Sequence, residues 1–532
     1  MRPHPAAGRP ASRRLRLGIA LAGAWLACLL AGCSLPPLEG RSSSQALPAA
    51  QAGETPLGRA VAPLAAQHPG QSGIHALTDP REAFAARVQL ARRAQRTLDV
   101  QYYIWRGDTT GTLLLDALRA AAERGVRVRL LLDDNGIAGL DPALAALDAH
   151  PQVEVRLFNP FAFRAFKPLG YVTDFARANR RMHNKSFTAD ATATVVGGRN
   201  VGDEYFGATD GVLFADLDVL AVGPAAQAVS ASFDAYWASA SAYPIAALMR
   251  PPSADAAAGA QVHAEQMERS PAAAAYKAAV QQLPFVRQLV EGRLPLVWAP
   301  TQLVADDPAK GLARAEPGQL LIHHMAEAVG QPTRSLDLVS PYFVPTDEGA
   351  DYFAALAGRG VRVRILTNSM AATDVLAVHS GYARHRRRLL EAGVVLYELK
   401  PDPAGAAAGE GRKEGRGLLG SSGSSLHAKT FGVDGRRVFV GSFNFDPRSA
   451  RLNTELGFVI DSPLLAQQME RVFGERVPAA SWEVRRDPSS GALRWVDAGR
   501  QPPAELASEP LTRWWQRAAV GLLALLPIEW ML

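Results

Sequence analysis

The chain contains the stretch RGVRVRL at residues 124–130 and repeats it as RGVRVRI at residues 359–365. A second repeated stretch precedes each copy, RTLDV at residues 96–100 and RSLDL at residues 334–338. All four stretches carry residues that favour strands, and a helical pattern that ends at glycine lies between the two members of each pair. A strand, a helix and a second strand in this order predict parallel strands joined by a crossover helix.

A third apolar stretch follows in each half, at residues 153–158 and 394–399. We therefore predict an α/β fold of two similar lobes, with mixed, largely parallel sheets related by a pseudo-two-fold axis. The middle segment has no counterpart in the repeat and is rich in alanine and proline. The predicted organisation is a lipoprotein signal peptide (1–32), a flexible tether (33–72), an N-terminal lobe (73–235), a helical insertion (236–314), a C-terminal lobe (315–500) and a tail (501–532).

Residues 1–32 differ in composition from the rest of the chain. They hold five arginines and no acidic residue, and an apolar run extends from Leu17 to Leu30. A basic segment before an apolar run too short to span a membrane is typical of a secretory signal. The run ends in LAGC, which resembles a bacterial lipobox, so we expect Cys33 to become the lipidated first residue of a periplasm-facing protein of the bacterial cell envelope. An uncleaved membrane anchor is the alternative.

The charge of the remaining chain excludes one class of partner. The formal net charge is +6, and five of these positive charges belong to residues 1–32, which leaves +1 for residues 33–532. A body so close to neutral lacks the basic surface that nucleic-acid binding requires. We therefore expect no nucleic-acid partner.

One motif occurs once in each half. It is His-x-Lys-x-x-x-x-Asp, followed further on by an asparagine, and the spacing between the two copies is constant for all four positions. The members are His183, Lys185, Asp190 and Asn200 in the first half, and His427, Lys429, Asp434 and Asn444 in the second. Because residues i and i+2 of an extended segment point to the same face, each histidine emerges beside its lysine. Two such segments that meet across the axis would bring both pairs into one pocket.

These residue types together suit a phosphodiester. Lys185 and Lys429 can bind the non-bridging oxygens, aided by the amides of Asn200 and Asn444. One imidazole would attack phosphorus and form a covalent phosphohistidine, and the other would protonate the leaving oxygen. The mechanism needs no cofactor, and we predict no metal site.

Four acidic residues complete the candidate site. Asp218 and Glu455 open matching apolar stretches, and we expect them to hold the ring nitrogens that do not react. Asp190 and Asp434 belong to the motif and therefore to the catalytic set, but their position predicts that they close a turn or bind backbone rather than touch substrate.

With its duplicated motif, the sequence resembles the phospholipase D superfamily, and more narrowly the bacterial cardiolipin synthases of the C type. The resemblance covers about residues 75–500. It implies transfer of a phosphatidyl group from phosphatidylglycerol or phosphatidylethanolamine to a phosphatidylglycerol hydroxyl, with His183 as nucleophile and His427 as acid and base. The stretches that carry it are LDVQYYIW (98–105), LLLDDN (130–135), VSPYFVP (339–345), TNSMAATDV (367–375), VHSGY (378–382), YELKP (397–401), GSSGSSLHAK (420–429), GSFNFDPRS (441–449) and LPIEW (526–530).

Two other functions are compatible with the sequence. The first is a hydrolase of the same fold, acting on lipids or, less in keeping with the charge, on nucleic acid. The second is a non-catalytic envelope lipoprotein, which we disfavour because both motifs are intact. Trp514, Trp515 and Arg517 precede an apolar run at residues 518–527, a pattern of an interfacial helix on a membrane or of a helix packed on the body. Residues 402–425 are expected to form a mobile loop beside the second motif.

Overall fold

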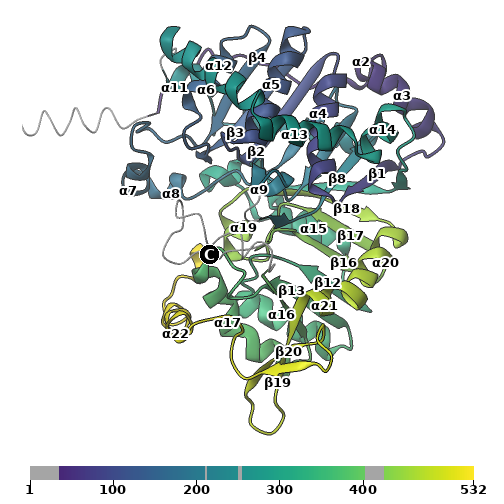
Figure 1. Ribbon diagram of the computed structural model, residues 1–532, viewed down its shortest axis with the longest axis vertical. Coiled ribbons are helices and arrows are strands. Elements are labelled where there is room, and N and C mark those ends of the chain that lie inside the picture. Colours follow the sequence, from purple (N-terminus) through teal and green to yellow (C-terminus); the bar gives the residue numbers. More distant parts are fainter. Residues whose placement is uncertain (1–34, 210–212, 250–253, 402–424) are drawn as a thin grey trace, which may run out of the picture.

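The computed structural model describes residues 35–209, 213–249, 254–401 and 425–532, and it has two α/β lobes (Figure 1). The N-terminal lobe is drawn in purple to teal and the C-terminal lobe in green to yellow. The expected signal peptide, Cys33 and nearly all of the expected loop at 402–425 lie outside the described residues.

The N-terminal lobe is built on a nine-stranded sheet of order β10-β1-β8-β6-β5-β2-β3-β4-β9. Helices α4 (Pro80–Arg93), α5 (Thr109–Glu123) and α6 (Asp141–Asp148) cover one face, and α10 (Pro224–Ala238) covers the other. The strands are β1 (Ser72–Leu77), β2 (Thr97–Ile104), β3 (Arg127–Gly136), β4 (Val153–Phe158), β5 (Ser186–Ala189), β6 (Ala193–Gly197), β8 (Asp218–Val222), β9 (Ala242–Pro244) and β10 (Val297–Ala299).

The C-terminal lobe has a ten-stranded sheet of order β11-β18-β17-β16-β12-β13-β14-β19-β20-β21. Helices α15 (Leu321–Val329), α16 (Thr346–Gly358) and α17 (Leu376–Glu391) pack on one face, and α20 (Pro463–Arg471) and α21 (Val477–Ala480) on the other. The strands are β11 (Thr301–Ala305), β12 (Ser335–Val339), β13 (Arg362–Asn368), β14 (Val395–Leu399), β16 (Thr430–Val433), β17 (Arg437–Gly441), β18 (Leu456–Asp461), β19 (Ser481–Arg486), β20 (Leu493–Asp497) and β21 (Ala504–Leu506).

The two sheets repeat one topology strand for strand. The central order β8-β6-β5-β2-β3-β4 of the first lobe matches β18-β17-β16-β12-β13-β14 of the second. The prediction of two similar lobes with mixed sheets is therefore confirmed. The expectation of largely parallel pairing is wrong: within these two sheets, as far as the structure describes them, only the neighbours β2-β3-β4 and β12-β13-β14 pair in parallel. Strands β5 and β6 are joined by a turn too short for a crossover, so they pair antiparallel.

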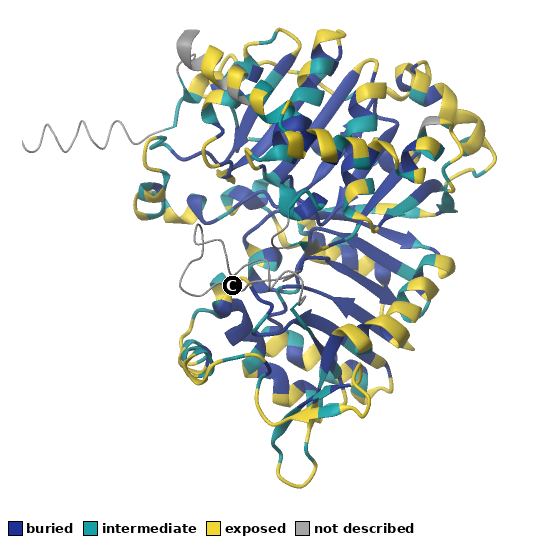
Figure 2. Cartoon of the chain, in the orientation of Figure 1, coloured by how far each residue is buried: buried dark blue, intermediate teal, exposed yellow. Residues whose placement is uncertain are grey.

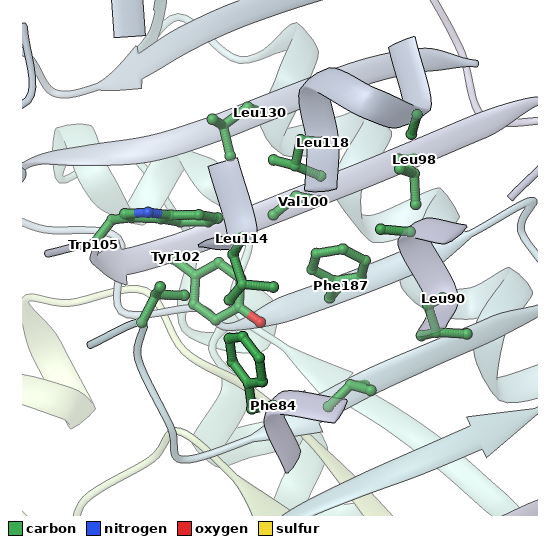
Figure 3. Packing of buried hydrophobic residues seen from close by; sticks show 14 of the residues in the cluster. Phe84, Leu90, Leu98, Val100, Tyr102, Trp105, Leu114, Leu118, Leu130 and Phe187 are labelled. Carbon is green, nitrogen blue, oxygen red and sulfur yellow. The ribbon is translucent and has the colours of Figure 1, made fainter. Parts of the chain in front are cut away.

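The repeated stretches are explained by a buried ion pair that occurs in both lobes. Arg129 Nε lies 2.7 Å from Asp99 Oδ1 between β3 and β2, and Arg364 Nε lies 2.6 Å from Asp337 Oδ1 between β13 and β12. A buried charge is tolerated only with a partner, so each repeat needs both residues. On the opposite face of the first sheet, apolar residues of β2 pack against α4 and α5; Figure 3 shows Leu98, Val100 and Tyr102 among Phe84, Leu90, Leu114 and Leu118.

The lobes meet through their motif-bearing halves. Val196 of β6 and Val219 of β8 share a hydrophobic cluster with Val440 of β17 and Phe458 of β18. Each lobe therefore lends apolar surface to the other, and burial of that surface holds the two motifs at one boundary.

The expected tether is in part wrong. Residues 49–53 and 56–66 form helices α2 (Ala49–Gly53) and α3 (Pro56–Ala66), and the segment before them lies along the first lobe. The carbonyl oxygen of Ser42 accepts from Arg156 at 2.7 Å and that of Ser44 accepts from Arg129 at 2.8 Å. These buried arginines have more donors than their own strands can satisfy, and the segment supplies acceptors.

The expected helical insertion also needs a correction. It contains α11 (Ile245–Leu248), α12 (Ala254–Glu268), α13 (Pro271–Gln281) and α14 (Pro284–Val290), but it ends in strands β10 and β11. These consecutive strands belong to different sheets, β10 at the edge of the first and β11 at the edge of the second. The insertion therefore links the two lobes covalently and supplies one edge strand to each sheet.

The tail packs on the C-terminal lobe. Strand β21 extends the second sheet, and α22 (Trp514–Leu523) lies against α17. Among the described residues, no helix has both the length and the apolar character needed to cross a bilayer.

Candidate active site

Each motif histidine is attached by its backbone to the opposite lobe. His183 N donates to the carbonyl of Thr454 at 2.8 Å, and His427 N donates to the carbonyl of Ala215 at 2.8 Å. The second contact continues a short parallel pairing of β15 (Ser425–Leu426) with β7 (Phe214–Ala215). Both histidines lie in extended segments that lead into β5 and β16, so the two motifs face each other across the lobe boundary.

The imidazole rings are held by carboxylates in a reciprocal arrangement. His183 Nδ1 lies 2.8 Å from Glu455 of the second lobe, and His427 Nδ1 lies 2.6 Å from Asp216 of the first. Both carboxylates are fully buried. Because Nδ1 is the orienting nitrogen in both rings, Nε2 is the nitrogen that can react with a substrate.

Glu455 has the expected position, but the expectation for Asp218 is wrong. Asp218 Oδ2 accepts from Arg87 at 2.9 Å and Oδ1 accepts from the backbone N–H of Arg199 at 3.1 Å. Asp216 replaces it beside His427. The physical reason is its place in the chain: Asp216 directly follows Ala215, whose carbonyl accepts from the backbone of His427, whereas Asp218 begins β8 two residues later.

Strand register shows which residues are equivalent. Gly197 pairs with Asp218, and Gly441 pairs with Gly457. Asp216 thus corresponds to Glu455, each followed by leucine. The sequence does contain this signal, because an acidic residue followed by leucine stands beside the apolar strand in both halves. In the first half, however, Asp218 lies closer to the apolar residues of the strand than Asp216, so Asp218 was selected instead.

A glycine and a serine at equivalent positions explain the small residues after β6 and β17. A side chain at Gly198 would collide with the carboxylate of Asp216. In the second lobe, the hydroxyl of Ser442 instead donates to Glu455, and Ser449 Oγ donates to the same carboxylate at 2.9 Å. Both positions therefore serve the carboxylate that orients a histidine.

The two lysines lie in the same buried cluster. Lys185 Nζ donates to the carbonyl of His183 at 2.5 Å, and Lys429 Nζ lies 2.9 Å from His427 Nδ1. Burial lowers the pKa of Lys429 to about 8 and that of Lys185 well below its ordinary value. Two buried lysine side chains that have few hydrogen-bond acceptors around them can bind an anionic group of a substrate.

Both lysines act on both imidazoles. Burial first, and then Lys185 and Lys429, lower the pKa of His183 well below its ordinary value. Burial and Lys429 lower the pKa of His427 to about 4, although Asp216 opposes them. Each ring thus senses the lysine of the opposite lobe, as expected if all four groups surround one pocket.

The two carboxylates differ in charge state. Burial raises the pKa of Glu455 to about 7, against the opposing effect of Lys185. Burial would also raise the pKa of Asp216, but His427 and Lys429 outweigh it and hold that pKa well below its ordinary value. Asp216 is therefore ionised at neutral pH, whereas Glu455 is close to its titration point.

The motif aspartates lie where the sequence predicts, in turns. Asp190 accepts from the backbone N–H groups of residues 95–97, and Asp434 accepts from those of residues 333–335. Both have positive φ, +50° and +55°. They join the turn after each motif strand to the start of β2 or β12, away from the imidazoles.

The two asparagines have different surroundings. Asn200 Oδ1 accepts from the backbone of Ile104 at 3.2 Å, and its Nδ2 donates to the hydroxyl of Tyr205 at 3.1 Å. Asn444 is buried, and its Oδ1 has no hydrogen-bond partner among the described residues. Asn200 therefore contacts Tyr205, which in turn packs against His427, whereas the Oδ1 atom of Asn444 accepts no hydrogen bond from the described residues.

Two tyrosines outside the predicted set of site residues pack against the histidines. The ring of Tyr103 lies edge-to-face on His183 with centroids 5.0 Å apart, and that of Tyr205 lies similarly on His427 at 5.3 Å. Lys185 Nζ is also 5.6 Å from the Tyr103 ring centre. These rings fix the imidazole planes and exclude water from one side.

The sequence is similar to that of a known protein family. Residues 88–237 and 321–477 match the family model described as cardiolipin synthase, PLD-like domain. The chain belongs to this family. It is 50% identical to cardiolipin synthase C of Escherichia coli (strain K12) over 480 residues. The aligned region covers 90% of this chain and 99% of that relative.

More distant relatives of this cardiolipin synthase family agree. Cardiolipin synthase A of Pseudomonas entomophila (strain L48) is 27% identical over 405 residues, 75% of this chain and 67% of that protein. Among solved structures, phosphatidylserine synthase of Haemophilus influenzae Rd KW20 aligns with a TM-score of 0.54 at 15% identity, covering 90% of this chain and all of that chain. That likeness establishes the fold, and the predicted family is confirmed.

Proposed function

We propose that this protein is a phosphatidyltransferase that makes cardiolipin from phosphatidylglycerol through a covalent phosphohistidine, with phosphatidylglycerol or phosphatidylethanolamine as the donor. One observation carries the proposal: two buried imidazoles, each oriented by a carboxylate of the opposite lobe, share one cluster with two buried lysines. Membership of the cardiolipin synthase family supports the choice of substrate.

The difference between the carboxylates supports the role of each histidine. A general acid must carry a proton, and the ionised Asp216 stabilises a protonated His427. His183 faces Glu455, whose raised pKa makes it a weaker stabiliser of positive charge. His183 therefore remains neutral and serves as the nucleophile.

The first step breaks the bond between phosphorus and the donor headgroup. His183 Nε2 attacks phosphorus, the headgroup oxygen leaves with the bonding electrons, and it takes the proton of His427. The negative phosphodiester raises the pKa of the adjacent imidazole, which favours a protonated His427 in the loaded site. Lys185 and Lys429 bind the non-bridging oxygens and balance the charge that builds on them.

The second step reverses these roles. The hydroxyl of a phosphatidylglycerol molecule gives its proton to the neutral His427, its oxygen attacks phosphorus, and the bond to His183 breaks. Cardiolipin leaves, and with phosphatidylglycerol as donor the by-product of the first step is glycerol. Asn444 Oδ1, which lacks a partner among the described residues, is available to a substrate hydroxyl.

The membrane provides both substrates, and we propose two surfaces that meet it. Trp514, Leu522 and Leu525 of the tail are 74%, 67% and 80% exposed. Phe166 and Val172 of the first lobe are 64% and 80% exposed, near α7 (Gly170–Thr173). Both segments project on the left side of the molecule in Figure 1, and Figure 2 marks their exposed residues in yellow. Aromatic and leucine side chains of this kind insert into the headgroup region of a bilayer.

We also propose that lipidated Cys33 anchors the protein in the bacterial cell envelope, facing the periplasm. The supporting evidence is the signal-like composition of residues 1–32 and the LAGC stretch. An anchor combined with an interfacial surface would hold the enzyme at its two-dimensional substrate.

The test is incubation of purified protein with labelled phosphatidylglycerol, with and without phosphatidylethanolamine, and resolution of lipids by mass spectrometry. Cardiolipin should accumulate, together with free glycerol. Phosphatidic acid without cardiolipin would instead assign a hydrolase, and cleavage of nucleic acid without lipid conversion would overturn the proposal.

A further inference from the structure

A hollow of about 380 Å³ lies in the C-terminal lobe, between helices α15 and α16 and the sheet. Its lining is apolar, with Met325 and Val329 from α15, Phe353 from α16 and Phe431 from β16. The polar side chains that line it include Glu348, Asp446 and Arg451. Pockets of this size and lining bind apolar parts of ligands, and the few polar groups fix their orientation.

The mouth of the hollow carries exposed apolar side chains beside one exposed ion pair, that of Glu348 with Arg451 at 3.3 Å. Ile322 and Tyr352, both in its lining, are each 42% exposed. Ala326 on α15 is also exposed and lines it. Large apolar side chains that stand at the edge of an apolar cavity, rather than singly on a surface, indicate a ligand-binding groove.

The hollow shares a wall with the catalytic centre. Phe443 and Phe445 line the hollow, whereas Asn444 between them belongs to the motif. Asp446 also lines it and receives the backbone N–H of Ser449 at 2.6 Å, and Ser449 Oγ donates to Glu455, the partner of His183. One short segment therefore separates an apolar cavity from the groups that bind phosphate.

We propose that this hollow holds one acyl chain of a phospholipid whose phosphate is bound at the catalytic centre. The inference rests on the proposed function, because a phosphatidyl substrate joins a phosphate to two unbranched apolar chains. The volume, the apolar lining and the common wall fit such a chain. A free fatty acid has the same chain without the phosphate, so the experiment includes it as a separate ligand.

Photolabelling tests the site without any need for turnover. Phosphatidylglycerol that carries a diazirine at the end of one acyl chain is irradiated with the full protein in mixed micelles, and labelled peptides are mapped by mass spectrometry. Label should appear in residues 321–329 and 346–358. Label confined to other segments, or labelling by a diazirine fatty acid but not by the phospholipid, would overturn the inference.

Two matched variants add a kinetic readout. Ala326→Trp fills the hollow from an exposed helix position, and Ala355→Trp places the same side chain on α16 at an exposed position outside the lining. Ala326→Trp should remove the label and raise KM for long-chain phosphatidylglycerol about tenfold, a size typical of lost apolar contacts. KM for dihexanoyl phosphatidylglycerol should stay unchanged, and Ala355→Trp should alter neither value.

The two proposals fail in different ways. If Ala326→Trp leaves the long-chain KM unchanged while cardiolipin forms, the acyl site is wrong and the synthase assignment stands. If the hollow is labelled but the product is phosphatidic acid alone, the acyl site stands and the transferase assignment fails. A smaller variant, Ala326→Leu, should give an intermediate KM and guards against misfolding of the tryptophan variant.

Discussion

Asp216 Oδ2 lies 2.6 Å from Nδ1 of His427, although the two residues belong to different lobes. Two residues further along, Asp218 is bound to Arg87 and does not orient a motif histidine. The two aspartates therefore offer a test that separates positioning from stability within three consecutive residues.

Asp216→Asn should lower kcat by about 10⁴-fold, as expected when an imidazole loses the carboxylate that orients it. The melting temperature should change little, because an amide can occupy the same space. Asp218→Asn leaves buried Arg87 without its ion pair and should destabilise the fold by about 3–5 kcal/mol. Steady-state kinetics and thermal unfolding of both variants check this; a large kcat loss confined to Asp218→Asn would reverse the assignment.

Gly198→Ala should reduce activity strongly, because its methyl group would displace the carboxylate of Asp216. The matched control is Gly474→Ala, at an exposed position where a methyl group meets nothing within 4 Å. Cardiolipin formation by the two variants is the measurement. Equal activities would show that the carboxylate tolerates displacement.

His183→Ala should abolish formation of a phosphorylated enzyme, whereas His427→Ala should allow it to accumulate slowly, since only the nucleophile bonds to phosphorus. Intact-protein mass spectrometry after incubation with phosphatidylglycerol detects the adduct, in alkaline solution where phosphohistidine survives. An adduct in the His183 variant alone would exchange the two roles.

Glu455 should make the stability of the protein depend on pH. Its pKa is near 4.5 when unfolded and about 7 when folded. The folded state thus binds the proton more tightly, so this contribution to stability is complete below about pH 4.5 and is lost as pH rises through 7.

Glu455→Gln removes that dependence. Between pH 5 and pH 7.5 the free energy of unfolding of the variant should rise relative to that of the wild type by about 1–3 kcal/mol. Urea denaturation at both pH values measures it. A difference that stays constant, or that changes with the opposite sign, would show that Glu455 is ionised throughout this range.

Leu525→Ser should weaken sedimentation with vesicles of phosphatidylglycerol and phosphatidylethanolamine, because it removes apolar surface from the tail that we propose to meet the membrane. Leu464→Ser provides the control, since Leu464 is 51% exposed on α20, apart from the tail. If both variants lose binding equally, the tail has no special part in it.

The sequence predicted those parts of the molecule that follow from local pattern. The alternation in RGVRVRL gave the strands, and the repeated His-x-Lys segments gave the site, because spacing along the chain determines both. Asp216 was missed because more residues separate it from Asn200 than separate Glu455 from Asn444, so the constant spacing fails beyond the asparagines.

Contacts between distant segments explain the other errors. The segment before α2 has the composition of a linker, yet buried Arg129 and Arg156 bind its carbonyl groups. The sequence of that segment does not predict these contacts, because the donor residues lie far along the chain. The pairing of each histidine with the opposite lobe is likewise a property of the packed lobes.

That exchange of carboxylates makes the protein indivisible as a catalyst. A fragment containing either lobe alone would carry a histidine and a lysine but would lack the acid that aligns the ring. A small rotation of one lobe relative to the other would separate both imidazoles from their carboxylates. A change that opens the boundary would therefore inactivate the nucleophile and the general acid together.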